Sequence, residues 1–100
     1  MENISAAEVK SRLTSGEKLN LVDVREDFEH SDFNIGGILL PLGKIQVMET
    51  EEIDNLKDQE IIFYCRTGNR SAQACLFLEM MGFSKVKNLA GGMVEYRSLS

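Results

Sequence analysis

The chain has no tryptophan, one proline and two cysteines among its 100 residues. Two cysteines are too few for a disulfide framework, and in a reducing compartment each would be a free thiol that needs its own explanation. No run of apolar residues approaches the roughly 20 that a membrane-spanning helix requires. The first ten residues lack the basic and apolar segments of a secretory signal, so we expect a cytoplasmic protein with no membrane association.

Basic residues are also in short supply. The chain has 11 lysines and arginines against 16 aspartates and glutamates, which gives a net charge of −5. General nucleic-acid binding needs a basic face, so we do not expect a nucleic-acid partner. The single histidine, His30, has no second ligand at metal-binding spacing, and no metal site is expected. Gly36-Gly37 and Gly91-Gly92 are isolated dipeptides rather than a phosphate-binding motif, so we expect no cofactor.

The remaining composition is that of a soluble globular protein, with 43% apolar and 27% charged residues. We expect residues 1–100 to form a single domain. Short β-branched runs alternate with helical stretches, which is typical of an α/β fold with a mainly parallel sheet. We expect about four to five strands with helices on both faces. The strands that the pattern indicates span residues 19–24, 38–40, 60–64 and 85–88.

Helices are predicted between and after these strands. Ser5 and Glu8 form a capping-box pattern at the start of a first helix that extends to Thr14. A short helical turn is expected over residues 26–31 and one or two helical turns within residues 44–57. A further helix is expected over residues 70–81, and a last helix follows Gly91-Gly92.

One segment carries the features of a reactive site. The most apolar strand, Glu60–Tyr64, leads directly to Cys65 and then through a short loop into a helix. Ligands of open α/β sheets bind outside the carboxyl ends of the strands. Gly68 allows a sharp turn, and the loop amides together with the helix N-terminus favour an anion. The loop that follows the cysteine consists of Arg66, Thr67, Gly68, Asn69 and Arg70.

These surroundings predict an unusual cysteine. Helix N-termini and nearby cations lower a thiol pKa from about 8.5, so Cys65 is expected to be a nucleophilic thiolate at neutral pH. Arg66 and Arg70 are the only charged residues between Ile61 and Leu78, and they would attract anions to the loop. Cys75 lies on the apolar face of the predicted helix and is interpreted as an inert core residue.

Four segments of the chain resemble the rhodanese family, in the same order. Cys65–Ser71 resembles the active-site loop of single-domain rhodaneses, in which a cysteine is followed by an arginine- and glycine-containing loop. Leu21–Glu26 (LVDVRE) is similar to an early family segment, Ile35–Leu42 to the middle signature, and Asn88–Gly92 (NLAGG) to a late one. The resemblance implies a small rhodanese-like domain.

The resemblance also implies an activity, that of a thiosulfate sulfurtransferase. The cysteine takes a sulfane sulfur from a small anionic donor such as thiosulfate or a persulfide, carries it as its own persulfide, and gives it to a thiol, of a protein or a small molecule, or to cyanide. By position, Cys65 is then the catalytic residue. The amides from Arg66 to Arg70 hold the persulfide, and Arg66 and Arg70 bind the donor anion. Asp23 and Arg25 are expected to form a buried pair that supports the fold.

Two positions depart from the family pattern. Many rhodaneses have histidine followed by isoleucine before the middle signature, where this chain has Asn34-Ile35. A tryptophan that is common near the end is missing, and Tyr96 is the nearest aromatic residue. Both positions are interpreted as structural, so the departures bear on donor preference more than on sulfur chemistry.

Other functions stay open from the sequence. Cysteine-dependent phosphatases and arsenate reductases also use a thiolate in an anion-binding loop, but they typically place five residues between cysteine and arginine. Only four separate Cys65 from Arg70, which indicates a smaller cradle suited to one sulfur atom. A persulfide relay that depends on a partner protein, or an interaction module with little turnover, is the other alternative.

Overall fold

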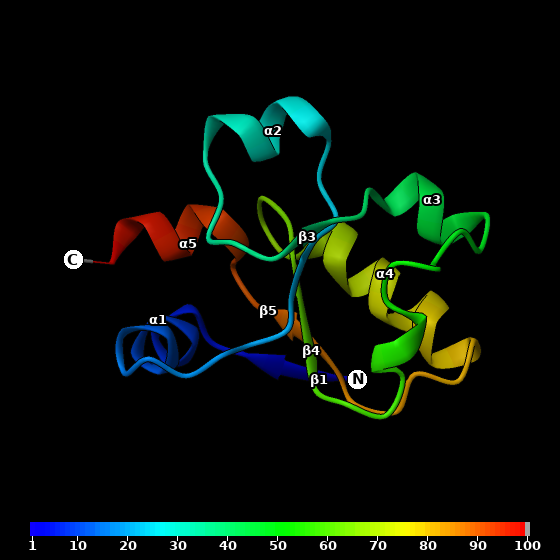
Figure 1. Ribbon diagram of the computed structural model, residues 1–100. Coiled ribbons are helices and arrows are strands. Elements are labelled where there is room, and N and C mark those ends of the chain that lie inside the picture. The colour runs from blue at the N-terminus through cyan, green and yellow to red at the C-terminus, as the bar shows by residue number, and fades with distance from the viewer. Residues whose placement is uncertain (100) are drawn as a thin grey trace.

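The computed structural model describes residues 1–99 and contains one five-stranded sheet. All of its strand pairs are parallel, in the order β1-β5-β4-β2-β3. The predicted α/β architecture with a parallel sheet is confirmed, and Figure 1 shows the sheet between its helices. The strands are β1 (Glu2–Ile4), β2 (Leu21–Asp23), β3 (Ile38–Leu39), β4 (Ile61–Tyr64) and β5 (Val86–Leu89).

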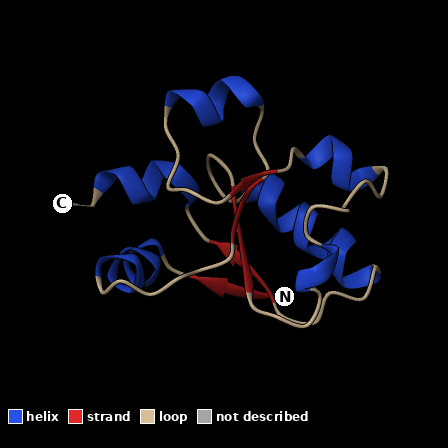
Figure 2. Cartoon of the chain, viewed as in Figure 1, coloured by secondary structure: helices blue, strands red, loops and turns tan. Residues whose placement is uncertain are grey.

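Helices cover both faces of this sheet. One face is covered by α1 (Ala6–Thr14) and α5 (Gly92–Ser98), and the other by α3 (Leu42–Gln46) and α4 (Asn69–Met80) (Figures 1 and 2). The short helix α2 (Asp27–Asp32) follows β2 and buries none of its own residues. A single 3-10 turn, η1 (Asp54–Leu56), lies between α3 and β4. No helix among residues 1–99 is long and apolar enough to cross a membrane.

β4 is the central strand, and all four of its residues are buried. Because side chains alternate along a strand, Ile61 and Phe63 pack into the core under α3 and α4, while Ile62 and Tyr64 pack into the core under α1 and α5. Cys65 continues this alternation and belongs to the first of these cores. The carboxyl end of β4 therefore lies between the ends of β2 and β5, where chain segments from both sides can reach the cysteine.

The sequence prediction missed one strand and gave only the approximate place of one helical region. Strand β1 was not expected, because three residues at an edge are too short for an alternating pattern; its pairing with β5, from Glu2 with Lys87 to Ile4 with Leu89, defines it. The one or two helical turns expected within residues 44–57 are α3, which begins earlier and ends at Gln46, and the η1 turn. The chain reverses at Met48, which has a left-handed φ of 63°.

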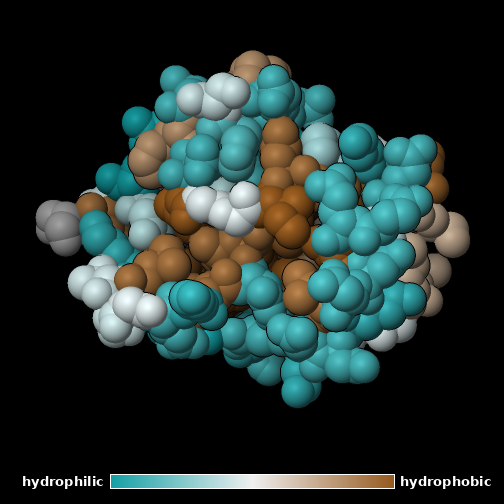
Figure 3. Space-filling model, viewed as in Figure 1, coloured by the Kyte–Doolittle hydropathy of each residue, from teal (hydrophilic) through white to brown (hydrophobic). Residues whose placement is uncertain are grey.

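The edge of the sheet at β3 is short and only half-buried. The space-filling view shows apolar side chains at the surface near the middle of the molecule, between polar surfaces on either side (Figure 3). A two-residue edge strand leaves few unpaired backbone groups for another chain to extend. The other edge strand is β1, so the segment that follows β4 begins in the middle of the sheet.

Candidate active site

Cys65 lies at the centre of a ring of hydrogen-bond donors. The backbone N–H of Gly68 donates to its sulfur over 3.1 Å, and the N–H of Ser71 over 3.4 Å. The hydroxyl of Ser71 also lies 3.4 Å from the sulfur. The cysteine is 1% exposed and also belongs to the core under α3 and α4, so its sulfur is both buried and surrounded by donors. A sulfur held by several donors is an environment for an anion.

The same contacts govern the acidity of the thiol. Burial raises the pKa of Cys65, but hydrogen bonds from the hydroxyl and amide of Ser71 and from the amides of Gly68 and Thr67 together outweigh it, so the pKa lies below its ordinary value. Cys75 shows the opposite behaviour. It has burial without donors, and burial raises its pKa to about 12. The two cysteines are therefore chemically distinct, because among residues 1–99 hydrogen-bond donors surround the sulfur of Cys65 and not that of Cys75.

The loop owes its shape to glycine and to the start of α4. Gly68 has a left-handed φ of 101° and immediately precedes the first helical residue, Asn69. A side chain at this position would also approach Leu89 O and Gly91 N at 3.4 Å. The turn directs the amides of Gly68 and Ser71 toward the sulfur, while the side chains of Thr67 and Asn69 are exposed on the outside.

Helix α5 holds the loop from the other side. The N–H of Met93 donates to the carbonyl of Cys65 over 2.9 Å, and the N–H of Val94 donates to the carbonyl of Arg66 over 3.0 Å. Gly92 lies so close that an added Cβ would be 2.5 Å from the backbone of Arg66. With these carbonyls bound on the outside, the loop presents N–H groups to its interior.

The two loop arginines have different surroundings. Arg70 forms two hydrogen bonds with the carboxylate of Glu29, of 2.7 and 2.9 Å. These bonds lower the pKa of Glu29 to about 2. Arg66 is exposed, and among residues 1–99 it forms no ion pair. The sequence predicted that both arginines lie beside the cysteine. It did not predict that Glu29, 41 residues from Arg70, forms hydrogen bonds with Arg70.

Asp23 and Arg25 form a buried ion pair after β2. Arg25 donates to the two oxygens of Asp23 over 2.9 and 2.8 Å, and their side chains are 6% and 0% exposed. His30 contacts the same carboxylate: its Nδ1 lies 2.9 Å from an oxygen of Asp23. Sequence reasoning considered His30 only as a metal ligand and missed this contact, because the fold of α2 against β2 creates it.

A groove of about 680 Å³ lies beside the loop. It joins one residue of the loop to α2 and α5, and it mixes cationic, acidic and apolar side chains. The residues that line it are Arg25, Phe28, Glu29, Asp32, Arg66, Met93, Val94 and Arg97. Phe28 and Val94 are 73% and 53% exposed, so a bound molecule would find apolar surface next to the cations.

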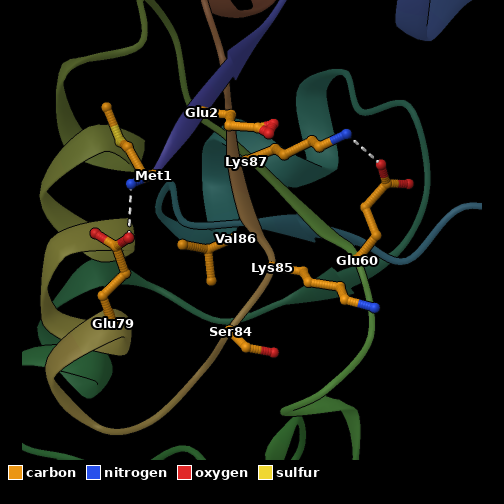
Figure 4. A pocket seen from close by; sticks show the side chains of 8 residues that line it. All are labelled: Met1, Glu2, Glu60, Glu79, Ser84, Lys85, Val86 and Lys87. Atoms are coloured by element: carbon orange, nitrogen blue, oxygen red, sulfur yellow. Dashed lines mark hydrogen bonds and ion pairs between the residues drawn. The ribbon is translucent and has the colours of Figure 1, made fainter.

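A second hollow, of about 340 Å³, lies near the amino end of β5 and is lined by neither cysteine. Figure 4 shows two ion pairs at its wall: the terminal ammonium of Met1 lies 2.6 Å from Glu79, and Lys87 lies 2.6 Å from Glu60. These pairs connect β1 to α4 and β5 to the start of β4, so the hollow has a structural explanation.

Comparison with known proteins agrees with this geometry. Residues 5–99 match the rhodanese-like domain family. A putative sulfurtransferase of Bacillus subtilis, YtwF, is 38% identical over 98 residues, which cover 96% of this chain and 90% of the relative. The putative sulfur carrier protein YrkF of the same organism is 35% identical over 94 residues, which cover 93% of this chain and about half (49%) of that protein.

The fold is also similar to that of a solved structure. The crystal structure of a rhodanese-like domain protein from Staphylococcus aureus has a TM-score of 0.83 and 28% identity, over 96% of this chain and 91% of that one. The extent of the match, the order of the sheet and the loop that surrounds Cys65 give one conclusion: the chain belongs to the rhodanese-like family of sulfurtransferases.

Proposed function

We propose that this protein transfers sulfane sulfur from a small anionic donor such as thiosulfate to a thiol acceptor, or to cyanide in an assay, through a persulfide on Cys65. The observation that carries the proposal is the position of the Cys65 sulfur, 3.1 to 3.4 Å from the amides of Gly68 and Ser71 and from the Ser71 hydroxyl. Such a ring supports a negative charge both on the thiolate and on the persulfide that replaces it.

The reaction has two displacements. The Cys65 thiolate attacks the outer sulfur of thiosulfate, a bond forms between the two sulfurs, and sulfite leaves with the electrons of the broken S–S bond. The persulfide anion then points into the space enclosed by the loop. An acceptor thiolate attacks its terminal sulfur, the Cys65–sulfur bond breaks, and the cysteine leaves as a thiolate. No metal or organic cofactor takes part in this scheme.

The groove beside the loop is the proposed route for both reactants. Arg66 lines it and follows Cys65 directly, so an anionic donor would be attracted toward the cysteine. Exposed Phe28 and Val94 offer apolar contact to an acceptor larger than cyanide. We place the protein in the cytoplasm in this proposal, because a reducing compartment keeps the Cys65 thiol free.

Intact-mass analysis after incubation with thiosulfate tests the proposal directly. The unmodified protein should gain one sulfur atom, and Cys65→Ser should gain none. A Cys75→Ala variant is the matched control and should gain sulfur like the unmodified protein. Loading that depends on Cys75, or that persists in Cys65→Ser, would overturn the assignment.

A sulfur relay is the second candidate, because one relative is named a putative sulfur carrier protein and this chain spans about half of it. A relay would receive sulfur from a partner's persulfide and would be slow with thiosulfate. Thiocyanate formation from cyanide, measured with thiosulfate and with a low-molecular-weight persulfide as donors, separates the two. A thiosulfate sulfurtransferase turns over with the first donor, and a relay only with the second.

Phosphatase activity is not expected. Four residues separate Cys65 from Arg70, and Arg70 is already held by Glu29. The loop therefore lacks a free guanidinium at the place where a tetrahedral oxyanion would need it. Hydrolysis of an aryl phosphate checks this point, and turnover abolished by Cys65→Ser would contradict the sulfurtransferase proposal.

A further inference from the structure

The hydroxyl of Ser71 has one hydrogen and two acceptors within reach. Its oxygen lies 3.4 Å from the Cys65 sulfur and also makes a short hydrogen bond to the side-chain oxygen of Asn88. A serine hydroxyl can donate only one hydrogen bond at a time, although it can accept others. Ser71 is fully buried, so water does not supply an alternative partner.

The contact continues from Asn88 to the surface. The amide nitrogen of Asn88 donates to the side-chain oxygen of Asn3 over 3.3 Å. Asn88 is 5% exposed on β5, whereas Asn3 lies exposed on the edge strand β1. An asparagine amide presents an acceptor at one end and donors at the other, and a half-turn exchanges them. Because Asn3 is exposed to solvent, its side chain can turn to pair with either orientation of the Asn88 amide.

We propose that Ser71 and Asn88 form a hydrogen-bond switch that follows the charge on Cys65. While the sulfur is neutral, the Ser71 hydroxyl donates to Asn88. When the thiol loses its proton to solvent, the hydroxyl turns to the thiolate, and Asn88 rotates so that its amide nitrogen donates to the Ser71 oxygen. Ser71 contacts the reacting atom itself, and Asn88 is a positioning residue that acts through Ser71.

This switch deepens the proposed function and rests on it for its catalytic meaning. In the persulfide the negative charge lies on the terminal sulfur, and the inner sulfur is close to neutral. The Ser71 hydroxyl therefore donates its hydrogen bond to Asn88 again. When an acceptor removes the terminal sulfur, the charge returns to the inner atom as the S–S bond breaks. Ser71 then stabilises the leaving thiolate, which lowers the barrier to sulfur delivery.

Charged groups near this end of the sheet do not replace the switch. Arg70 on α4 is paired with Glu29 of α2, and Asp23 after β2 is paired with Arg25. Arg66 is exposed on the loop. Among residues 1–99, the hydrogen bonds of the Ser71 and Asn88 side chains go to Cys65, Asn3 and each other, and none goes to a charged side chain.

Alkylation of Cys65 by iodoacetamide as a function of pH tests the switch without any sulfur donor. Peptide mapping separates Cys65 from Cys75. Ser71→Ala should raise the apparent pKa of Cys65 by about one unit, a tenfold change in its acid dissociation constant. Asn88→Asp places an obligatory acceptor next to Ser71 and should also raise it. In the Ser71→Ala background, Asn88→Asp should add little.

Each outcome decides the matter. An unchanged pKa in folded Ser71→Ala overturns the proposal. So does an Asn88→Asp shift of equal size in both backgrounds, because a direct charge effect would not need Ser71. Should Ser71→Ala fail to fold, Ser71→Gly removes the same hydroxyl and takes its place in both backgrounds, and the same two results then overturn the proposal. Because no sulfur transfer is measured, loss of the proposed sulfurtransferase activity and loss of the switch would be seen separately.

Discussion

Arg70 of α4 and Glu29 of α2 are joined by two hydrogen bonds across 41 residues of chain. The pair places a carboxylate beside the cation that precedes Ser71, and it connects the cysteine loop to a helix that buries none of its own residues. Arg70 therefore holds α2 through its hydrogen bonds, and in the proposed function its remaining role is to add positive charge to the region around the loop.

Replacing Arg70 by alanine should weaken the use of anionic donors. We expect the KM for thiosulfate to rise about fivefold, equivalent to ~1 kcal/mol, while the sheet stays folded. Arg66→Ala should have a similar effect, because Arg66 is the exposed cation of the same loop. Glu29→Gln is the control of opposite sign: it removes the competing carboxylate and should lower the KM. Steady-state kinetics with thiosulfate check all three, and unchanged KM values would contradict the steering role.

Gly92→Ala should disturb the backbone of the loop, including the carbonyl of Cys65, without altering the cysteine side chain. Gly92 has a left-handed φ of 57°, and an added Cβ would lie 2.5 Å from the backbone of Arg66. We expect a loss of stability of at least about 2 kcal/mol and a strong reduction of sulfur loading. Gly43→Ala is the matched control, because nothing lies within 4 Å of its added Cβ. Urea unfolding and intact mass measure the two effects, and equal behaviour of both variants would be inconsistent with close packing at Gly92.

Asp23→Asn should be strongly destabilising. It leaves the buried guanidinium of Arg25 without its counter-charge and removes the anion that faces His30. Breaking such a pair costs about 3–5 kcal/mol in buried settings. Asp27→Asn, on the exposed side of α2, is the control and should stay within about 0.5 kcal/mol of the unmodified protein. Denaturant unfolding of the three proteins compares these free energies.

Acid should weaken the fold through Glu60. Hydrogen bonds from Arg12, with a further contribution from Lys87, lower the pKa of Glu60 to about 2 from its ordinary 4.5. A depressed folded-state pKa means that the stabilisation is complete above about pH 4.5 and is lost as the pH falls toward 2. We expect Glu60→Gln to cost about 1–2 kcal/mol at pH 7, since solvent partly screens the pairs, and to flatten this acid dependence. Urea unfolding at pH 7 and pH 3 measures both, and a Glu60→Gln slope equal to that of the unmodified protein would count against it.

The two cysteines should differ in reactivity. Hydrogen bonds lower the pKa of Cys65 despite its burial, whereas burial raises the pKa of Cys75 to about 12. Iodoacetamide at pH 7.5 should therefore modify Cys65 in the folded protein and Cys75 only after denaturation. Peptide mapping before and after addition of urea distinguishes the sites. Modification of Cys75 first in the native protein would contradict the assignment.

Local sequence was sufficient to predict the sheet core and the loop. The β-branched run at Ile61–Tyr64 and the glycine at position 68 determine strand, turn and helix over a dozen neighbouring residues, and the structure has all three. Strand ends were less accurate: the strand expected from residue 19 begins at Leu21. Such limits depend on pairing with neighbouring strands, which a single strand's pattern does not contain.

Contacts between distant segments were beyond the sequence pattern. Ser71 was seen as the last residue of the loop signature but not as a partner of the sulfur, because its partner Asn88 comes from another strand. Glu29 was counted among the residues of a helical turn, and nothing in its neighbourhood indicates that Arg70 binds it. These contacts arise only when α2, α4 and β5 meet at the carboxyl end of the sheet.

The loop around Cys65 is completed by residues that follow the cysteine by roughly thirty positions. The amides of Met93 and Val94 bind the carbonyls of Cys65 and Arg66, so the loop has no outer support until α5 has folded onto the sheet. During synthesis the cysteine leaves the ribosome roughly thirty residues before its supports, at rates of ~5–20 residues per second. A nascent chain therefore carries an ordinary thiol, and sulfur chemistry begins only when the fold closes.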